Sequence, residues 1–152
     1  MQVKEILHIK GSTLYTVTPA TTLADAVISM ADHDIGSVVV MEAGKLVGML
    51  TFREIIKVLA RRQQENRVGP PPTMSQITVS EVMEAKPAVA TPAMEVDQLR
   101  TIMIESHQRY MPVMDGDMLL GVISFHDVAR AVLEEQAFEN RMLKGYIKNW
   151  PA

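Results

Sequence analysis

A hydroxyl and a carboxylate three residues apart occur twice in this sequence, each time behind a glycine and two apolar residues. Ser124 and Asp127 form one pair, and Thr51 and Glu54, 73 residues earlier, form the other. The apolar residues predict a short buried strand that ends at the hydroxyl, and the carboxylate then falls in the first turn of a following helix. At such a corner the hydroxyl, the carboxylate and the free N–H groups of the helix can face the same space. The sequence therefore predicts two polar pocket lips.

The sequence around both pairs is repeated as well. At the offset of 73 and without gaps, residues 17–57 align with residues 90–130. Upstream, residues 3–7 resemble residues 79–83 at an offset of 76, so the first copy carries three extra residues. Identical residues stand at Thr18/Thr91, Pro19/Pro92, Ala20/Ala93, Met30/Met103, Val40/Val113, Met41/Met114, Leu46/Leu119, Gly48/Gly121 and Phe52/Phe125. One unit is used twice, and because a repeat of roughly 60 residues is marginal alone, we expect the two to pack together.

Each copy predicts the order strand, helix, strand, strand, helix, which is an α+β fold. Apolar spacing, threonine caps and turn residues place these elements. In the second copy, Val96, Leu99 and Met103 fall on one buried helix face. In the first copy the expected elements are strands at 14–17, 37–41 and 46–50, a helix from the caps near Thr22 to Ile35-Gly36, and a helix at 53–61.

The repeats also set the expected domain boundaries. We expect a first repeat at 1–61, a linker at 62–76, a second repeat at 77–130, and a C-terminal helix and tail at 131–152. The linker contains Gly69-Pro70-Pro71-Pro72, which favours neither helix nor sheet. The terminal helix should run from Asp127 to about Lys144 and stop at Gly145. We expect the tail with Trp150 to dock on another surface.

Composition excludes several classes of function. The chain has 152 residues, of which 47% are hydrophobic, so it can bury a core. Its net charge of −3 gives no electrostatic footprint for nucleic acid, and no cysteine is present for disulfides or thiolate chemistry. No run approaches the roughly 18 apolar residues of a membrane span. We predict a soluble cytoplasmic protein with neither a nucleic-acid nor a membrane partner.

These residues resemble the tandem cystathionine-β-synthase (CBS) domain pair, the Bateman module, over residues 3–130. The resemblance rests on the doubled pattern of glycine, two apolar residues, Thr/Ser and a carboxylate three residues later. It also rests on Met111-Pro112-Val113-Met114-Asp115 before the second turn and on the Thr-Pro that opens each long helix. It implies a pseudo-twofold module with two clefts between the repeats. Such clefts commonly bind adenosine-containing ligands such as AMP, ADP, ATP, NAD or S-adenosylmethionine.

The resemblance also implies site residues. In that family the Thr/Ser and Asp bind the ribose hydroxyls, and a carboxylate can accept hydrogen bonds from both hydroxyls of a diol. The second-copy site would use Ser124 and Asp127 for ribose, His126 near phosphate, and Ser12, Thr13, Leu14, Ile35 and Gly36 as the adenine wall. The first-copy site would use Thr51, Arg53 and Glu54, with Lys86, Pro87 and Ala88 as its adenine wall. Arg109 and Tyr110 would contact phosphate between the clefts.

One departure from the family pattern separates the two sites. Glu54 replaces the expected aspartate, and its extra methylene moves the carboxylate outward by about one bond length. We therefore expect the Asp127 site to be the better nucleotide site. Plainer roles exist for these residues, because Ser124, Thr51 and Asp127 can simply cap helices, and Arg53, Arg109 and His126 can be solvated surface residues.

Catalysis and metal binding find little support in the sequence. Asp32-His33-Asp34 has no second ligand cluster, so we expect no metal site. No nucleophile, base and orienting group recur together at either lip, which indicates a binding protein and not an enzyme. We predict a regulatory sensor in which an adenine nucleotide fixes the angle between the repeats and changes the surface offered to an unknown regulated protein. The alternative is a ligand-independent dimerisation or interaction scaffold with vestigial clefts.

We also expect a homodimer, because modules of this family usually pair through the exposed faces of their helices. Here those helices start near Arg53 and Asp127.

Overall fold

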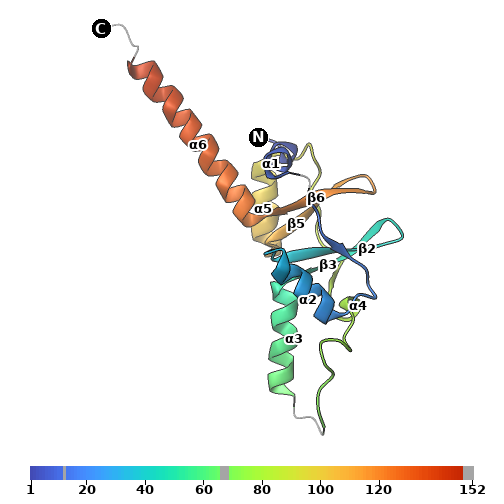
Figure 1. The fold of residues 1–152 in the computed structure, drawn as a ribbon. Helices are drawn as coiled ribbons and strands as arrows, with labels where there is room; N and C mark the ends of the chain where they lie inside the picture. The colour runs from blue at the N-terminus through green and yellow to red at the C-terminus, as the bar shows by residue number, and fades with distance from the viewer. Residues whose placement is uncertain (12, 66–68, 149–152) are drawn as a thin grey trace.

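The order of helices and strands follows the duplication and confirms the α+β fold (Figure 1). The computed structural model describes residues 1–11, 13–65 and 69–148. The first copy contains α1 (Val3–Lys10), β1 (Thr16–Val17), α2 (Leu23–Asp32), β2 (Ser37–Glu42), β3 (Lys45–Thr51) and α3 (Phe52–Gln64). The second contains α4 (Val79–Val82), β4 (Glu84–Ala85), α5 (Val96–Ser106), β5 (Tyr110–Asp115), β6 (Met118–Ser124) and α6 (Phe125–Lys148).

The two β-hairpins have the same strand register. β2 pairs antiparallel with β3 from Ser37↔Thr51, and β5 pairs with β6 from Tyr110↔Ser124. Both hairpins shift register at the same place, between Val40 and Met41 in the first copy and one offset of 73 later in the second. A parallel pairing precedes each hairpin, at β1 in the first copy and as a single bridge, Ala90↔Val113, in the second. The repeat seen in the sequence is therefore a repeat of hydrogen bonding.

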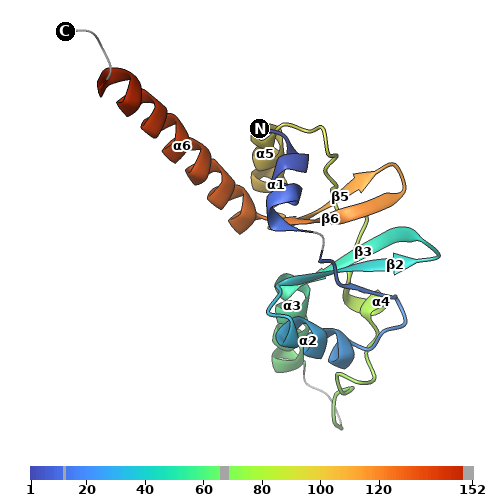
Figure 2. The same ribbon diagram turned by 45° about the horizontal axis from the view of Figure 1, so that its top comes forward.

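The first helix of each copy packs on the other copy. α1 packs against α6 and β6, whereas α4 packs against α3 and β3, as Figures 1 and 2 show. The Val3 N–H donates to the Met94 carbonyl over 2.9 Å, and the Val79 N–H donates to the Thr21 carbonyl over 2.8 Å. These two bonds are equivalent under the offsets of 76 and 73. The exchange is thus present twice, once in each direction.

The two hydrophobic cores include the exchanged helices. Val3 and Ile6 of α1 are buried among Leu99, Met111 and Ile123 of the second copy. Val79 of α4 is buried in the core of the first copy, with Leu23, Ala26, Met30 and Leu50. Burying each such side chain stabilises the fold by about 1.5–3 kcal/mol. Each core is therefore built from both copies.

The glycine that opens each lip motif makes room for the exchanged helix. A Cβ at Gly121 would lie 2.9 Å from Cδ2 of Leu7 in α1, and one at Gly48 would lie 2.5 Å from Sδ of Met83, which follows α4. Leu7 and Met83 are equivalent under the offset of 76. Glycine at both strand positions follows from this close approach of a side chain from the other copy.

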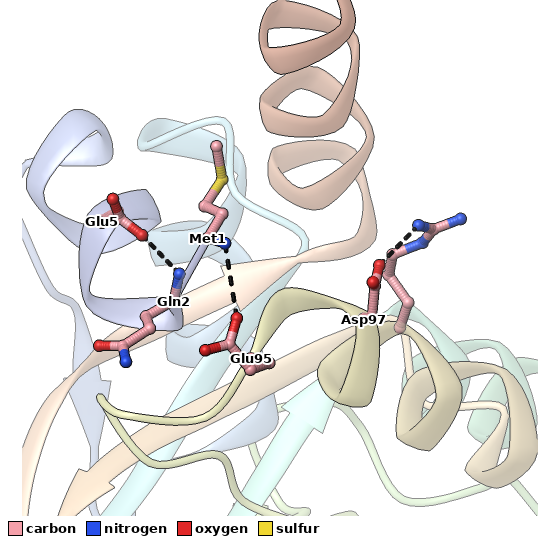
Figure 3. Close-up of polar contacts among 6 residues, drawn as sticks. Met1, Gln2, Glu5, Glu95 and Asp97 are labelled. Atoms are coloured by element: carbon pink, nitrogen blue, oxygen red, sulfur yellow. Dashed lines mark hydrogen bonds and ion pairs between the residues drawn. The ribbon is translucent and has the colours of Figure 1, made fainter.

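Polar contacts also fix α1 to the start of α5. The amino group of Met1 lies 3.4 Å from the Glu95 carboxylate, and the backbone N–H of Gln2 donates to Glu5. Figure 3 draws both contacts as dashed lines. The Val96 N–H donates to the Met1 carbonyl over 2.9 Å. The first turn of α1 is thereby capped by its own Glu5 and joined to the second copy.

Some helix ends differ from those expected. α6 continues through Gly145, which lacks the positive φ of a terminating glycine, so the expected stop there is wrong. α2 ends at Asp32, before the expected Ile35-Gly36, because Asp34 adopts a left-handed φ of 51°. α3 extends to Gln64, into the expected linker, and Arg61 and Arg62 lie favourably near its C-terminus. Trp150 lies outside the described residues.

None of the helices in the described ranges combines the length and apolarity needed to cross a membrane.

Candidate functional site

The Ser124 and Asp127 side chains meet at the corner between β6 and α6. The Ser124 backbone N–H donates to Oδ2 of Asp127 over 2.8 Å, and the Asp127 N–H donates to Oγ of Ser124 over 3.0 Å. This reciprocal pair satisfies N–H groups that the first turn of a helix leaves unpaired. The structure therefore brings the two predicted residues together, and they cap α6.

The Thr51 and Glu54 pair caps α3 more completely. The backbone N–H and the hydroxyl of Thr51 both donate to Oε1 of Glu54, each over 2.8 Å. The Thr51 hydroxyl oxygen in turn accepts from the Arg53 N–H over 3.1 Å. Glu54 is only 7% exposed. Its longer side chain folds back over the helix end, so this carboxylate is directed into the capping box.

Lys10 adds a cation to the second-copy corner, and the sequence analysis did not predict this residue. Its ammonium lies 2.7 Å from Oδ2 of Asp127 and donates to the Val122 carbonyl, also over 2.7 Å. The offset of 76 aligns Lys10 with Lys86, and the family resemblance implied Lys86 as a residue of the first-copy site. The repeat could therefore have indicated Lys10 as a residue of the second-copy site. Lys86 is exposed with a φ of 55°, and among the described residues it forms no ion pair with Glu54. The two corners therefore differ in charge.

The electrostatics of Asp127 reflect this neighbour. Partial burial acts to raise the pKa of the Asp127 carboxyl, but the hydrogen bond from Lys10, those from Ser124 and the positive charge of Lys10 outweigh it. The net effect lowers the pKa of Asp127 below its ordinary value. Asp127 is consequently a carboxylate at neutral pH, held between a helix N-terminus and an ammonium group.

Most other residues predicted for the second-copy site are exposed or half-buried. Thr13, His126 and Arg109 are exposed, and Leu14 and Ile35 are half-buried. Ser12 lies outside the described residues. The side chains of these residues make no hydrogen bond to Asp127 in the described part of the chain.

Gly36 and Tyr110 are brought together from different copies. A Cβ at Gly36 would overlap the Tyr110 hydroxyl and would lie 2.7 Å from the ring of Phe52. Tyr110 is half-buried at the start of β5. Arg53 also reaches across the copies, because its guanidinium donates to the His107 carbonyl over 3.5 Å. These residues join the repeats directly.

A profile of the CBS domain matches residues 3–61 and residues 79–134, which together make up most of the chain. The chain belongs to the CBS domain family. It is similar to the CBS domain-containing protein YhcV of Bacillus subtilis, with 32% identity over 114 residues that cover 75% of each protein. Among solved structures, a CBS-domain protein of Agrobacterium tumefaciens is 32% identical, with a TM-score of 0.75 over 86% of this chain and 98% of that one.

Two further matches bear on how CBS domains are used. A CBS domain pair solved in complex with 5′-methylthioadenosine and S-adenosyl-L-methionine has a TM-score of 0.74 at 23% identity, over 89% of this chain and 98% of that one, which shows the shared fold. The arabinose 5-phosphate isomerase KdsD of Salmonella typhimurium is 27% identical, but the match covers only 37% of that enzyme. The CBS repeats are thus an accessory part of some larger enzymes and most of the length of other relatives.

The predicted adenine wall of the first CBS site is held by a side-chain amide. Oε1 of Gln108 accepts from the Ala88 N–H over 3.1 Å, and its Nε2 donates to the Ala88 carbonyl over 2.8 Å and to the Tyr110 carbonyl over 2.9 Å. Pro112 explains this clamp, because it stands at the position of Val39 in the first repeat and has no N–H to donate to the neighbouring strand. Gln108 supplies the missing donor. Pro87 is half-buried beside this clamp.

Two hollows lie elsewhere on the CBS pair. One, of about 260 Å³, lies between α3, the proline segment and α4, and includes Arg61, Arg62 and Pro72 in its lining. The other, of about 250 Å³, includes Met1, Arg100 and Glu139 in its lining. Neither is lined by a residue predicted to bind nucleotide.

The Asp32-His33-Asp34 segment is occupied by local contacts. The His33 ring stacks on Tyr15 with ring centroids 3.8 Å apart, and its Nδ1 lies 2.8 Å from the Ser29 carbonyl. Within the residues that the structure describes, no group of three histidine, aspartate or glutamate side chains is gathered closely enough to hold a metal ion.

Proposed function

We propose that this CBS pair is a regulatory module that binds one adenosine-containing ligand at the Ser124 and Asp127 corner. The Lys10 ammonium beside the Asp127 carboxylate carries this proposal. Oδ2 of Asp127 accepts the bonds from the Lys10 ammonium and from the Ser124 N–H, and neither of these two bonds uses Oδ1. Oδ1 can therefore accept a bond from one ribose hydroxyl, while Lys10 can donate to the other hydroxyl or to a phosphate.

The same contacts support a choice between the two corners. At Glu54 the carboxylate is buried and receives both Thr51 donors, with no lysine beside it in the described residues. At Asp127 the side chain is 19% exposed and a cation is in place. The proposed ligand class comprises AMP, ADP and ATP, with NAD and S-adenosylmethionine as further candidates and no metal required. A structural neighbour that binds 5′-methylthioadenosine and S-adenosyl-L-methionine supports this class.

A ligand at this corner would act on the arrangement of the repeats. Lys10 belongs to the first copy and Asp127 to the second, so a molecule that contacts both would restrain one copy relative to the other. Differential binding to one arrangement is what a sensor requires. The regulated protein would read the changed surface, and the module itself would not be a catalyst. A cytoplasmic location stays a prediction.

Titration calorimetry on ligand-free protein tests the proposal. AMP, ADP, ATP, NAD and S-adenosylmethionine would each be titrated into the unmodified chain, Asp127→Ala and Glu54→Ala. We expect binding of at least one ligand, its loss in Asp127→Ala and its retention in Glu54→Ala, which removes the same kind of helix cap. At a ligand concentration a hundred times Kd, stability should rise by about 2.7 kcal/mol. Absence of heat for all five ligands, or equal affinity in Asp127→Ala, would refute the proposal.

The competing function is a ligand-independent scaffold. It is favoured by the capping bonds that both carboxylates already make. Absorbance at 260 nm that survives dialysis of the purified protein would favour the nucleotide sensor. A ligand-free dimer would favour the scaffold.

A homodimer through α3 and the start of α6 is part of both functions. Phe52, Ile56 and Leu59 on α3 are each at least 50% exposed at helical spacing, and Phe125 opens α6 at the position equivalent to Phe52. An apolar face of this kind is typical of a contact between proteins. Phe52→Glu/Ile56→Glu should yield monomers in sedimentation velocity, and an unchanged dimer would place the contact elsewhere.

A further inference from the structure

An aromatic stack joins the residue before β1 to the residue after α2. The ring centroids of Tyr15 and His33 lie 3.8 Å apart, with an angle of 25° between the ring planes. The His33 ring is also fixed by its Nδ1, which lies 2.8 Å from the Ser29 carbonyl. Because a carbonyl can only accept, this nitrogen carries the proton and donates. The stack therefore holds together two chain segments that are distant in the sequence.

The second copy makes the same connection with different side chains. The offset of 73 takes Tyr15 to Ala88 and His33 to Ser106, and neither of these side chains has a ring. In their place, the amide of Gln108 exchanges two hydrogen bonds with the backbone of Ala88. The segment before the first hairpin strand is thus tied to the turn after the long helix in both copies. Unrelated side chains that serve one connection indicate that both copies need these segments held together.

Tyr15 is connected to the Asp127 corner through α1. Lys10, the last residue of α1, lies 2.7 Å from Oδ2 of Asp127, and Tyr15 follows Lys10 by five residues. Leu14, which immediately precedes Tyr15, is half-buried and was predicted above as part of the adenine wall. One end of this segment is therefore held at the corner by an ion pair, and the other end is held by the stack.

His33 is connected to the same corner through β5. Gly36 follows His33 by three residues and packs so closely on Tyr110 that a Cβ would overlap the Tyr110 hydroxyl. Tyr110 in turn pairs with Ser124 across the β5–β6 hairpin. The stack therefore closes a circuit of contacts that begins at Asp127 and ends at Ser124. The first-copy corner lacks such a circuit in the described residues, because its lysine forms no ion pair with the carboxylate there.

We propose that Tyr15 and His33 are positioning residues for the adenosine-containing ligand of the Asp127 corner, an inference that rests on the proposed function. Their stack holds the segments that carry Leu14 and Ile35 in the arrangement that the base of the ligand requires, and neither ring has to contact the ligand. A ligand that finds these segments already in place binds without the entropic cost of ordering them. When the stack is lost, the binding-competent fraction of the protein falls, and the apparent Kd rises by the same factor.

The first test measures ligand affinity by titration calorimetry. The probe is whichever of AMP, ADP, ATP, NAD and S-adenosylmethionine binds the unmodified chain most tightly. Tyr15→Leu, which keeps an apolar side chain but removes the ring, should weaken binding about two- to twelvefold, which corresponds to the roughly 0.5–1.5 kcal/mol of an aromatic pair. His33→Ala should weaken binding over the same range. Tyr15→Phe, which keeps the stack, should bind as tightly as the unmodified chain.

Val58→Ala is the matched control for stability. Val58 is 5% exposed in the core of the first copy, against which Tyr15 also packs, but it lies on α3 and outside the circuit. Its truncation should lower the melting temperature and leave the Kd unchanged. Unchanged affinity in both Tyr15→Leu and His33→Ala would overturn the proposal. An equal loss in Val58→Ala would overturn it as well, because the effect would then come from general destabilisation.

The second test reads the two segments without a ligand, by amide hydrogen exchange. The Ile35 N–H donates to the Met30 carbonyl over 3.0 Å, and it should exchange faster in Tyr15→Leu than in the unmodified chain or Tyr15→Phe. Unchanged exchange would show that the stack holds nothing and would also overturn the proposal. If none of the five compounds binds the unmodified chain, the proposed function fails and this inference fails with it. If binding depends on Asp127 but not on the stack, only this inference fails.

Discussion

Replacing Asp127 with asparagine separates the ion pair from the helix cap. The Asp127 carboxylate accepts bonds from the Ser124 N–H at 2.8 Å and from Lys10 at 2.7 Å. Asparagine can still accept the first bond but offers Lys10 no charge. Because the Lys10 side chain is 37% exposed and that of Asp127 19%, we place the loss near the upper end for exposed pairs. Asp127→Asn should lower the free energy of unfolding at pH 7 by about 1 kcal/mol.

The pH dependence of this loss has a definite sign. The pKa of Asp127 is lowered in the folded chain, so the pair stabilises the fold above the unfolded-state pKa of about 3.9. That contribution disappears as the pH falls from there through the lowered folded-state pKa. The stability difference between the unmodified chain and Asp127→Asn should therefore be constant above about pH 5 and should shrink toward zero below the lowered pKa.

Urea unfolding followed by circular dichroism from pH 3 to pH 8 measures both quantities. Lys10→Met should lose a similar amount, and the double variant should lose little more than either single one. Asp97→Asn is the control, because its partner Arg100 is 3.1 Å away but its side chain is 91% exposed. It should change stability by less than about 0.5 kcal/mol. No loss at pH 7, or a loss that persists undiminished in acid, would refute the assignment of the ion pair.

Substitutions at Gln108, Gly36 and Glu54 test other parts of the structure. Gln108→Ala should lower the free energy of unfolding in urea by about 2 kcal/mol, because the Ala88 N–H and carbonyl lose their partner. Gln108→Glu should also lower it at pH 7, because a carboxylate can accept from the Ala88 N–H but cannot donate to the Ala88 carbonyl. Gly36→Ala should lower the free energy of unfolding by about 1–3 kcal/mol, because the added methyl group overlaps Tyr110. The double variant Gly36→Ala/Tyr110→Ala should recover part of this loss. If Gly36→Ala melts at the same temperature as the unmodified chain, the packing of Tyr110 on Gly36 is contradicted. Glu54→Ala should cost about 1–2 kcal/mol by uncapping α3, and a neutral result would show that the buried carboxylate contributes nothing.

The sequence predicted the repeated parts of the fold because their signals are local. Val96, Leu99 and Met103, the residues expected on the buried helix face of the second copy, are buried. The hairpin turns lie where Gly44 and Gly116 adopt positive φ. Spacing of apolar residues and turn chemistry act over a few residues, so one sequence suffices to read them.

The exchange of α1 and α4 could not be predicted in the same way. Val3 and Val79 are apolar and occupy equivalent places, so either would fit either core, and the pattern does not say which. The Lys10 contact depends on that exchange and was missed with it. Gln108 left a weaker trace, since Pro112 in a strand position signals an N–H that must be replaced.

The sequence predicted which residues meet at the candidate site, but not which hydrogen bonds their side chains make. Ser124 and Asp127 do lie together, as their spacing of three residues predicts, but each is engaged in a helix cap. Which oxygen of Asp127 remains without a partner depends on side-chain geometry, which spacing does not determine. The ligand role of these residues stays a prediction for calorimetry.

The exchange of α1 and α4 has a consequence for the origin and the folding of the chain. A single copy, made as a separate polypeptide, would expose an apolar groove where the first helix of the other copy packs in the intact chain. Two such polypeptides could fill both grooves only by exchanging α1 and α4, as subunits of domain-swapped dimers do. When the two copies are fused in one chain, their association becomes intramolecular, so each copy is present at a high effective concentration for the other. The halves should accordingly melt in a single cooperative transition, and neither should be recovered folded after they are severed.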